Sequence, residues 1–204
     1  MNSIIINNLH FAYNKQEPLI YCSSLKLESG NIYALVGANG SGKTTFLKLL
    51  LGLLKPTTGE IKGIAGHKIG FVPDYNGLYD TLTVLENIKI RLALYGCNYL
   101  KEESRICKLI EKYSLTSAKN TLVKNLSLGM KKKAAIICAI ATKPSLLVLD
   151  EPTGGIDKAA HKELSIMLKD YLAPNTMILC TSHDLDFLDT LPLLTINFPL
   201  GETK

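Results

Sequence analysis

A glycine-rich segment between an apolar run and a helical pattern constrains this chain more than any other feature. Residues 32–36 are typical of a buried strand, and 46–54 repeat apolar residues at helical spacing up to Lys55-Pro56. Between them the sequence GANGSGKTT matches the pattern GxxxxGK[ST]. The segment consists of Gly37, Ala38, Asn39, Gly40, Ser41, Gly42, Lys43, Thr44 and Thr45. An ordinary strand-to-helix turn needs neither three glycines nor a lysine, so the pattern predicts a specialised loop.

The residue types of this loop suit a polyphosphate. Glycines let the backbone curl so that successive N–H groups face the β- and γ-phosphates, and the next helix adds the partial positive charge of its N-terminus. Lys43 is expected to reach the β/γ-phosphates, and the Thr44 hydroxyl can bind Mg²⁺. The loop therefore predicts a site for a nucleoside triphosphate and Mg²⁺.

A second motif lies far downstream. Residues 146–149 are an apolar run that ends in Asp150 and Glu151. A buried strand that ends in Asp places the carboxylate at the carboxyl edge of a parallel sheet, where a metal–phosphate complex would lie. Asp150 is then the candidate Mg²⁺ partner, and Glu151 the candidate catalytic residue that polarises an attacking water. A strand that simply ends in a solvated acidic pair is the alternative, and the upstream phosphate loop argues against it.

The rest of the chain predicts an α/β fold with a helical insertion. Apolar residues occur at helical spacing in 82–95, 102–113 and 158–172. They form a continuous run, typical of a strand, in 177–180. A Ser-His-Asp sequence follows the last run at 182–184. We expect one domain over 1–204, with a nucleotide-binding core in 1–73 and about 127–204. The section between, about 74–126, has few strand signals and is expected to form a helical subdomain.

Composition places the chain among ordinary globular proteins. With 204 residues, 47% of them hydrophobic, it can bury one good core, and no repeat or low-complexity tract divides it. The longest unbroken apolar run, 134–141, is far shorter than the roughly 20 residues that cross a bilayer. No secretory signal is visible, and the five cysteines form no CxxC pair. We therefore expect a soluble chain with reduced thiols that works inside the cell.

The net charge of +5 does not by itself indicate a nucleic-acid partner. Among the 23 basic residues only Arg91 and Arg105 are arginines, the side chain that reads phosphates and bases with two parallel hydrogen bonds. The lysines are spread along the chain, apart from a short run at 131–133. This distribution favours a solvated, lysine-rich surface, and no nucleic acid is expected as a partner.

Five motifs occur in an order that resembles the ATP-binding subunit of an ABC transporter. Besides the phosphate loop (Walker A) and Asp150-Glu151 (Walker B), the sequence LSLGM at 126–130 stands where the family has its LSGGQ signature. Gly155-Ile156-Asp157 resembles the D-loop, His183 resembles the switch histidine, and 69–88 is similar to the Q-loop region. The resemblance spans nearly the whole chain. It implies ATP as the nucleotide and a P-loop NTPase core: a mostly parallel sheet flanked by helices, with a small antiparallel β part at the N-terminus.

The resemblance also implies roles for residues outside the phosphate loop. In the family, two ATP molecules lie between the Walker A loop of one subunit and the signature of the other. The signature residues that would contact the opposite ATP are Ser127, Leu128, Gly129 and Met130. His183 would hold the γ-phosphate and the attacking water, and Asp157 would be the D-loop residue. Tyr13, which shares a strand face with Phe11 by its spacing, would stack on adenine, and a core or edge-strand tyrosine is the alternative.

The lysines at 131–133 begin the helix that follows the signature. Three positive charges at a helix N-terminus are unfavourable against the helix dipole. An anion that approaches this helix end would relieve the conflict. The alternative is that the three long side chains simply extend into water.

Three features depart from the family pattern. The Q-loop glutamine is replaced by Asp74, a further candidate metal ligand that only accepts hydrogen bonds and adds a negative charge beside the γ-phosphate. Hydrolysis could therefore be slower or depend more on the metal. Leu128 and Met130 make the signature similar to that of drug and antimicrobial-peptide exporters. The segment 60–68 is shorter than the β-hairpin usual at this place, as expected of a minimal cassette.

The resemblance implies an ATPase subunit that powers a separate membrane permease, with export favoured by the signature. Two copies of the chain would form two active sites, and a heterodimer in which this chain supplies an impaired site stays open. Candidate permease contacts beside the Q-loop are Tyr75, Leu78, Tyr79 and Leu82. Internal packing is the alternative for at least half of them. The subunit would then lie in the cytoplasm, on the inner face of the cell membrane through the permease.

Two other functions stay open. Asp74 and Met130 would suit a nucleotide-gated switch, which dimerises with ATP but hardly turns over. A soluble ABC ATPase that acts on nucleic acid or ribosomes shares the same site. Such proteins usually carry two cassettes or a long coiled-coil insertion, whereas this sequence has one phosphate loop and only a short section between Lys43 and Asp150.

Overall fold

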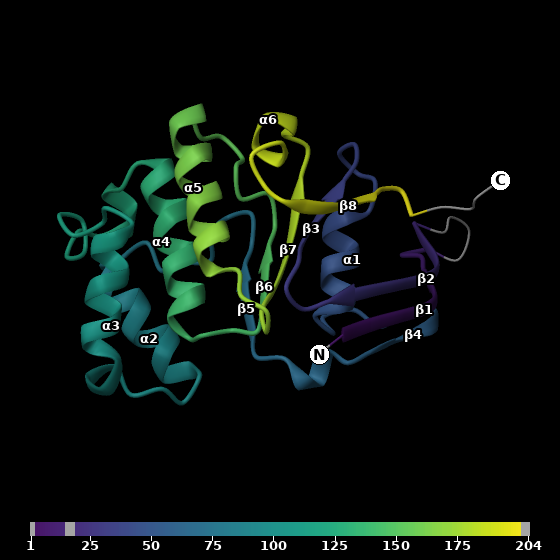
Figure 1. Cartoon of the computed structure of the whole chain (residues 1–204), viewed down its shortest axis with the longest axis horizontal. Coiled ribbons are helices and arrows are strands. Elements are labelled where there is room, and N and C mark those ends of the chain that lie inside the picture. The colour runs from purple at the N-terminus through teal and green to yellow at the C-terminus, as the bar shows by residue number, and fades with distance from the viewer. Residues whose placement is uncertain (1–2, 15–18, 201–204) are drawn as a thin grey trace.

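Two β-sheets and the helices around them organise the chain. The computed structural model describes residues 3–14 and 19–200, and within these residues one sheet has five strands and the other three. The larger sheet stands near the middle of the molecule, with helices α2 to α5 on one side and the smaller sheet on the other (Figure 1). The two hydrophobic clusters lie on opposite faces of the larger sheet, one with helices α2 to α5 and the other with helix α1 and the smaller sheet.

The larger sheet is parallel and carries the motifs at its carboxyl edge. Its strands, in spatial order, are β5 (Ile69–Val72), β6 (Leu146–Leu149), β7 (Met177–Ser182), β3 (Ile32–Val36) and β8 (Leu193–Asn197). Every residue of β6 and β7 is buried. Parallel strands covered on both faces read as continuous apolar runs, which is why these segments show no polar–apolar alternation.

The smaller sheet is antiparallel and contains the N-terminus. Its order is β2 (Ile20–Glu28), β1 (Ser3–Phe11) and β4 (Thr58–Lys62), and Ile6 of β1 lies opposite Leu25 of β2 and Ile61 of β4. Burial alternates along the first half of β1, because one face of this sheet packs inward. The expected mostly parallel sheet and antiparallel N-terminal part are both confirmed.

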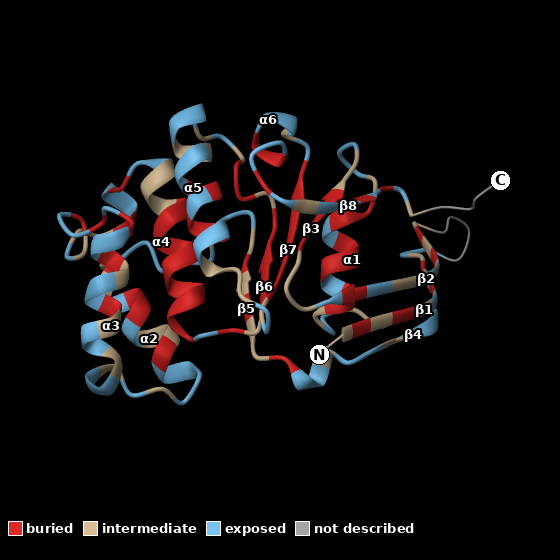
Figure 2. Ribbon diagram, viewed as in Figure 1, coloured by how far each residue is buried: buried red, intermediate tan, exposed pale blue. Residues whose placement is uncertain are grey.

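The helices cover both faces of the parallel sheet. Helix α1 (Lys43–Leu50) packs between the two sheets, and its buried Phe46 and Leu47 belong to the cluster that also contains Ile6. On the opposite face lie α4 (Leu128–Ala141) and α5 (Lys158–Tyr171), and α4 is buried along most of its length (Figure 2). The remaining helices are α2 (Val84–Leu94), α3 (Tyr99–Lys112), α6 (Leu185–Leu188) and the 3₁₀ turns η1 (Ile64–Gly66) and η2 (Val123–Asn125).

Several helix ends differ from those expected, and capping explains two of them. Helix α4 begins at Leu128, before the lysines, because the Ser127 side chain accepts the Met130 N–H as an N-cap. Helix α3 begins at Tyr99 rather than 102, since the Asn98 side chain accepts the Leu100 N–H. Helix α1 ends at Leu50, earlier than the apolar spacing indicated. None of the helices in the described residues has both the length and the apolar character needed to cross a bilayer.

Candidate functional site

The phosphate loop connects β3 to α1 through backbone positions that side chains would obstruct. A Cβ on Gly37 would lie 2.5 Å from the Phe198 carbonyl oxygen and 2.9 Å from Ser41 Oγ. Gly42 caps α1 with φ near +100°, a conformation that residues with a side chain rarely adopt. Gly37 therefore allows the loop to pack closely against the residue that follows β8 (Leu193–Asn197), and the loop ends at the N-terminus of α1.

The environments of Lys43 and Ser41 indicate that this loop binds an anion. The Lys43 side chain is only 6% exposed, and its Nζ donates to the backbone oxygens of Gly37 and Ala38 at 2.8 and 3.1 Å. The Ser41 hydroxyl is buried and has no hydrogen-bond partner among the described residues. Within the described residues, the ammonium hydrogen-bonds only to neutral carbonyls, with the Glu151 carboxylate 3.8 Å away, and the hydroxyl is unpaired. Phosphate oxygens would satisfy both groups, so the loop fits a polyphosphate.

Two side chains whose oxygens can bind a metal ion meet where the phosphate loop faces the end of β6. The Thr44 hydroxyl donates to both carboxylate oxygens of Asp150, and the buried Thr181 hydroxyl of β7 donates to one of them at 2.7 Å. Asp150 is 6% exposed. A hydroxyl and a carboxylate are the ligands that Mg²⁺ takes when phosphates complete its shell. The described part of the chain contains no group of three or more His, Cys, Asp or Glu residues that could hold a metal ion by themselves.

Glu151 is held in a strained conformation beside this pair. Its φ of 45° lies in the left-handed region, and its N–H donates to Thr181 Oγ1 at 2.8 Å. One carboxylate oxygen lies 3.1 Å from Nδ1 of His183, and the other lies 3.8 Å from Lys43 Nζ. The backbone thus turns the side chain toward the phosphate loop, as a residue that polarises a water there requires.

His183 follows β7 directly, in the position expected for the switch histidine. Its side chain is 58% exposed, so more than half of it remains open to solvent. The next residue, Asp184, accepts the Phe187 N–H and caps α6. This cap fixes the start of the turn that carries the imidazole.

Tyr13 lies beside the phosphate loop but not on a strand. Strand β1 ends at Phe11, so the expectation that both aromatic residues share a strand face is wrong. The Tyr13 hydroxyl lies 3.2 Å from Thr45 Oγ1, and its ring packs edge-to-face against Phe11 at a centroid distance of 4.9 Å. Because the Tyr13 side chain is 59% exposed, a ring face remains available for stacking.

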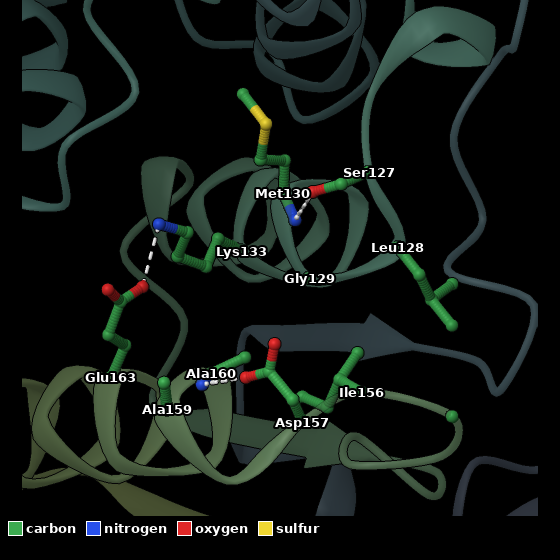
Figure 3. Close-up of a pocket in the computed structure, with 11 residues that line it drawn as sticks. Ser127, Leu128, Gly129, Met130, Lys133, Ile156, Asp157, Ala159, Ala160 and Glu163 are labelled. Atoms are coloured by element: carbon green, nitrogen blue, oxygen red, sulfur yellow. Dashed lines mark hydrogen bonds and ion pairs between the residues drawn. The ribbon is translucent and has the colours of Figure 1, made fainter.

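The signature residues line a different cavity, of about 440 Å³, between the starts of α4 and α5. Figure 3 shows Ser127 and Leu128 on one side of it and Asp157 on the other. Asp157 caps α5 by accepting the Ala160 N–H at 2.8 Å. A Cβ on Gly129 would lie 3.3 Å from that of Ala160, so the two helix ends approach closely. Met130 completes the lining of this part of the cavity.

The lysines of α4 do not all extend into water. Lys132 is 3% exposed and Lys133 is 9% exposed, which contradicts the solvated alternative for these two. Lys133 forms an ion pair of 2.7 Å with Glu163, and Lys131 lies 3.8 Å from Asp80. Neighbouring carboxylates therefore offset the charge that the helix N-terminus disfavours.

Asp74 begins the loop after β5 and faces the Walker motifs. It lines a cavity of about 400 Å³ together with Thr44, Asp150 and Glu151. Its side chain is 68% exposed, and one oxygen lies 3.6 Å from Lys132 Nζ. Sequence reasoning did not single out Lys132 or Thr181 as site residues. The sequence signal that could have identified Thr181 is its position just before Ser182-His183.

Comparison with known proteins decides the family. Residues 22–154 match the profile described as "ABC transporter". The chain belongs to this family. The lantibiotic transport ATP-binding protein SrtF of Streptococcus pyogenes is 33% identical over 193 residues, a match that covers 91% of this chain and 82% of SrtF. The bacitracin transport ATP-binding protein BcrA of Bacillus licheniformis is 32% identical over 203 residues, covering 94% of this chain and 65% of BcrA.

A solved structure agrees with the sequence relatives. A structure described as the ATP-binding subunit of an ABC transporter superposes with a TM-score of 0.82 at 25% identity, covering 96% of this chain and 85% of the other. This chain is therefore an ATP-binding subunit of an ABC transporter and contains the family's ATPase domain. The family and the subunit type expected from the motif order are confirmed.

Proposed function

We propose that two copies of this chain, each a single domain over 1–204, hydrolyse ATP at two composite sites. The observation that carries the proposal is the separation of the two halves of a site within one chain. The cavities beside the Walker motifs and the cavity at the signature have no lining residue in common. ATP bound to the Walker A loop of one copy is therefore enclosed only when the signature of a second copy covers it.

Within such a site, residues of the Walker motifs have distinct roles. Loop N–H groups bind the phosphates, and the Lys43 ammonium exchanges its carbonyl partners for phosphate oxygens. Thr44 and Asp150, with Asp74 as a further candidate ligand, hold Mg²⁺, which when bound offsets the phosphate charge. The Glu151 carboxylate accepts a hydrogen bond from the attacking water, and the His183 imidazole orients the γ-phosphate and that water.

The signature acts on the ATP of the opposite copy. Ser127 and the N–H of Gly129 lie at the N-terminus of α4, where the helix dipole favours a γ-phosphate. The half-exposed Leu128 and the Met130 beside it surround these polar groups with apolar surface. Asp157 lies across the same cavity and is proposed to contact the partner copy.

A membrane permease is the proposed partner. Tyr75 is 79% exposed and Tyr79 56% exposed, whereas Leu78 packs against the core, so about half of the expected contacts are open. The cavity beside Tyr75 also includes the exposed Leu53. A permease seated there would place the subunit on the inner face of the membrane. The names of SrtF and BcrA, which state transport of a lantibiotic and of bacitracin, support a peptide antibiotic or a similar molecule as the transported substrate, and the signature favours export.

The test is Mg-ATP hydrolysis by the purified chain over a range of protein concentrations. A rate per chain that rises with concentration, and that falls at least about 100-fold in Glu151→Gln, supports a dimeric ATPase. Glu111→Gln changes an exposed carboxylate on α3 and serves as the control. A rate per chain independent of concentration contradicts the composite site. A purified transporter with one copy of this chain beside a different subunit contradicts the homodimer.

A nucleotide-gated switch is the second candidate, favoured by the carboxylate of Asp74 beside the Walker motifs. In that case ATP would dimerise the wild-type chain, but its hydrolysis rate would stay at the level of Glu151→Gln even with the permease bound. Comparison of these two rates distinguishes the switch from the ATPase.

A further inference from the structure

Lys132 is a buried cation that bonds to two loops of the ATPase site. Its side chain is 3% exposed, and its Nζ donates to the backbone oxygen of Asp74 at 2.7 Å and to that of Glu151 at 3.1 Å. These two residues follow β5 and β6, neighbouring strands of the parallel sheet. One ammonium group therefore joins the two chain segments that carry the Q-loop position and the candidate catalytic carboxylate.

The bond to Glu151 acts on a residue whose conformation needs support. Glu151 has a φ of 45°, which a side chain disfavours. Its N–H is fixed by Thr181, and its carbonyl oxygen accepts from both Lys132 and the Gly154 N–H. Loss of the Lys132 ammonium removes one of these restraints and lets the peptide group, and with it the carboxylate, move.

The charge of Lys132 requires a nearby anion. A buried ammonium with only neutral carbonyl partners carries a large desolvation penalty. The carboxylate of Asp74, 3.6 Å from Nζ, supplies the opposite charge. Lys132 in turn offsets the negative charge of Asp74. A bound polyphosphate therefore experiences a net charge near zero from this pair.

We propose that Lys132 is a positioning residue of the ATPase site, which holds the carbonyl groups of Asp74 and Glu151 and balances the Asp74 carboxylate. The inference rests on the proposed ATPase function. It assigns two separable effects to this pair. Of the two residues only Lys132 restrains Glu151, which affects the chemical step, whereas the net charge depends on both residues and affects nucleotide affinity.

Three variants separate these effects: Lys132→Gln, Asp74→Gln and the double variant. Lys132→Gln lowers kcat about tenfold, since Glu151 loses a restraint, and raises KM for ATP about threefold, since the site becomes more negative. Asp74→Gln makes the site more positive, so without Mg²⁺ it lowers the dissociation constant of the nucleotide about threefold. The double variant returns this dissociation constant to the wild-type value, while its kcat stays at least as low as in Lys132→Gln. Higher salt reduces the shifts in affinity because it screens charge.

Equilibrium binding of a fluorescent ATP analogue without Mg²⁺ provides a readout independent of turnover. The dissociation constant rises in Lys132→Gln, falls in Asp74→Gln and returns in the double variant. Shifts in the same direction for both single variants overturn the proposal, because a merely structural role weakens binding in each. A kcat within twofold of wild type in Lys132→Gln overturns it as well.

The charge pair Lys112 and Asp170, which joins α3 to α5 at 3.0 Å, supplies a matched control. Lys112→Gln, Asp170→Asn and their double variant leave kcat, KM and nucleotide affinity unchanged. If Lys132→Gln does not fold, Asp74→Gln alone still tests the charge effect, because its side chain is largely exposed. A wild-type chain that binds ATP without hydrolysing it contradicts the proposed function, and the opposite binding shifts still test the pair.

Discussion

The Thr44 hydroxyl donates to both carboxylate oxygens of Asp150, at 3.1 and 3.0 Å, although the two residues are 106 positions apart in the chain. The bond joins the start of α1 to the end of β6. Thr181 of β7 adds a third element by donating to the same carboxylate. The carboxylate proposed to hold Mg²⁺ is thus positioned by three elements of the core.

Thr181→Val tests this arrangement. Valine preserves the shape of the buried side chain but removes the hydroxyl that donates to Asp150 and accepts the Glu151 N–H. We expect the free energy of unfolding to fall by about 1–3 kcal/mol, because the Glu151 N–H loses its partner and the Asp150 carboxylate keeps only Thr44 among the described residues, and the ATPase rate to fall with it. Urea denaturation measures the first effect, with Thr181→Ser as the control that keeps the hydroxyl. Equal stability of the valine variant and the wild type would contradict this role.

Gly37→Ala is expected to weaken nucleotide binding. The new Cβ would lie 2.5 Å from the Phe198 carbonyl oxygen, so the loop or the strand end must shift. Overpacking of this kind costs about 1–3 kcal/mol, and we expect ATP affinity to fall at least about tenfold. Gly66→Ala is the control, since a Cβ at Gly66 meets nothing within 4 Å. Similar ATP affinities for the two variants would refute the close-approach argument.

Tyr13 offers a test of adenine stacking that is specific to the base. Tyr13→Ala should raise the dissociation constant of ATP about tenfold, because stacking of a base on an aromatic ring contributes about 1–3 kcal/mol. Tyr13→Phe should retain most of the affinity, apart from the hydroxyl contact with Thr45. Binding of inorganic tripolyphosphate, measured by calorimetry, should be the same in wild type and Tyr13→Ala. An equal loss for both ligands would show that Tyr13 acts on the loop instead.

Glu102 predicts a pH-dependent contribution to stability. Hydrogen bonds from Arg105 and then Lys143 lower the pKa of Glu102 from 4.5 to about 2. A lowered pKa in the folded state stabilises the protein above the unfolded value, and this stabilisation is lost as pH falls from about 4.5 toward 2. We therefore expect Glu102→Gln to be less stable than wild type at pH 7, with a difference that disappears near pH 2. A difference in urea midpoints that stays constant over this range would exclude the effect.

Sequence patterns predicted the elements of this fold better than their ends. Runs such as 146–149 are continuous and apolar because both sheet faces are covered, and this signal is local. Helix ends depend on caps, and the Ser127 cap moved the start of α4 ahead of the lysines. The position of Tyr13 beyond the end of β1 was also unpredictable from spacing alone, since strand pairing decides where β1 stops.

The Walker residues could be predicted because their spacing is a property of one continuous loop. Lys132 could not, because its burial depends on two distant loops that bring carbonyl oxygens to one point. In the sequence it is the middle lysine of three and differs from its neighbours in no visible way. Residues that support a site through backbone contacts leave no pattern of their own in a single sequence.

The central claim is that one ATPase site contains residues from two chains, and mixing two inactive variants tests it directly. Lys43→Ala disables every Walker A loop, and Gly129→Asp places a carboxylate where the opposite γ-phosphate is proposed to bind. A carboxylate in the first turn of α4 suits the helix dipole, but its Cβ would lie 3.3 Å from that of Ala160, so circular dichroism must first show that this variant folds. In a mixed dimer, one site combines the intact Walker A loop of one chain with the intact signature of the other. We predict that ATP hydrolysis, absent from each variant alone, appears on mixing. A mixture as inactive as its components, measured where the wild type hydrolyses ATP, would contradict the claim.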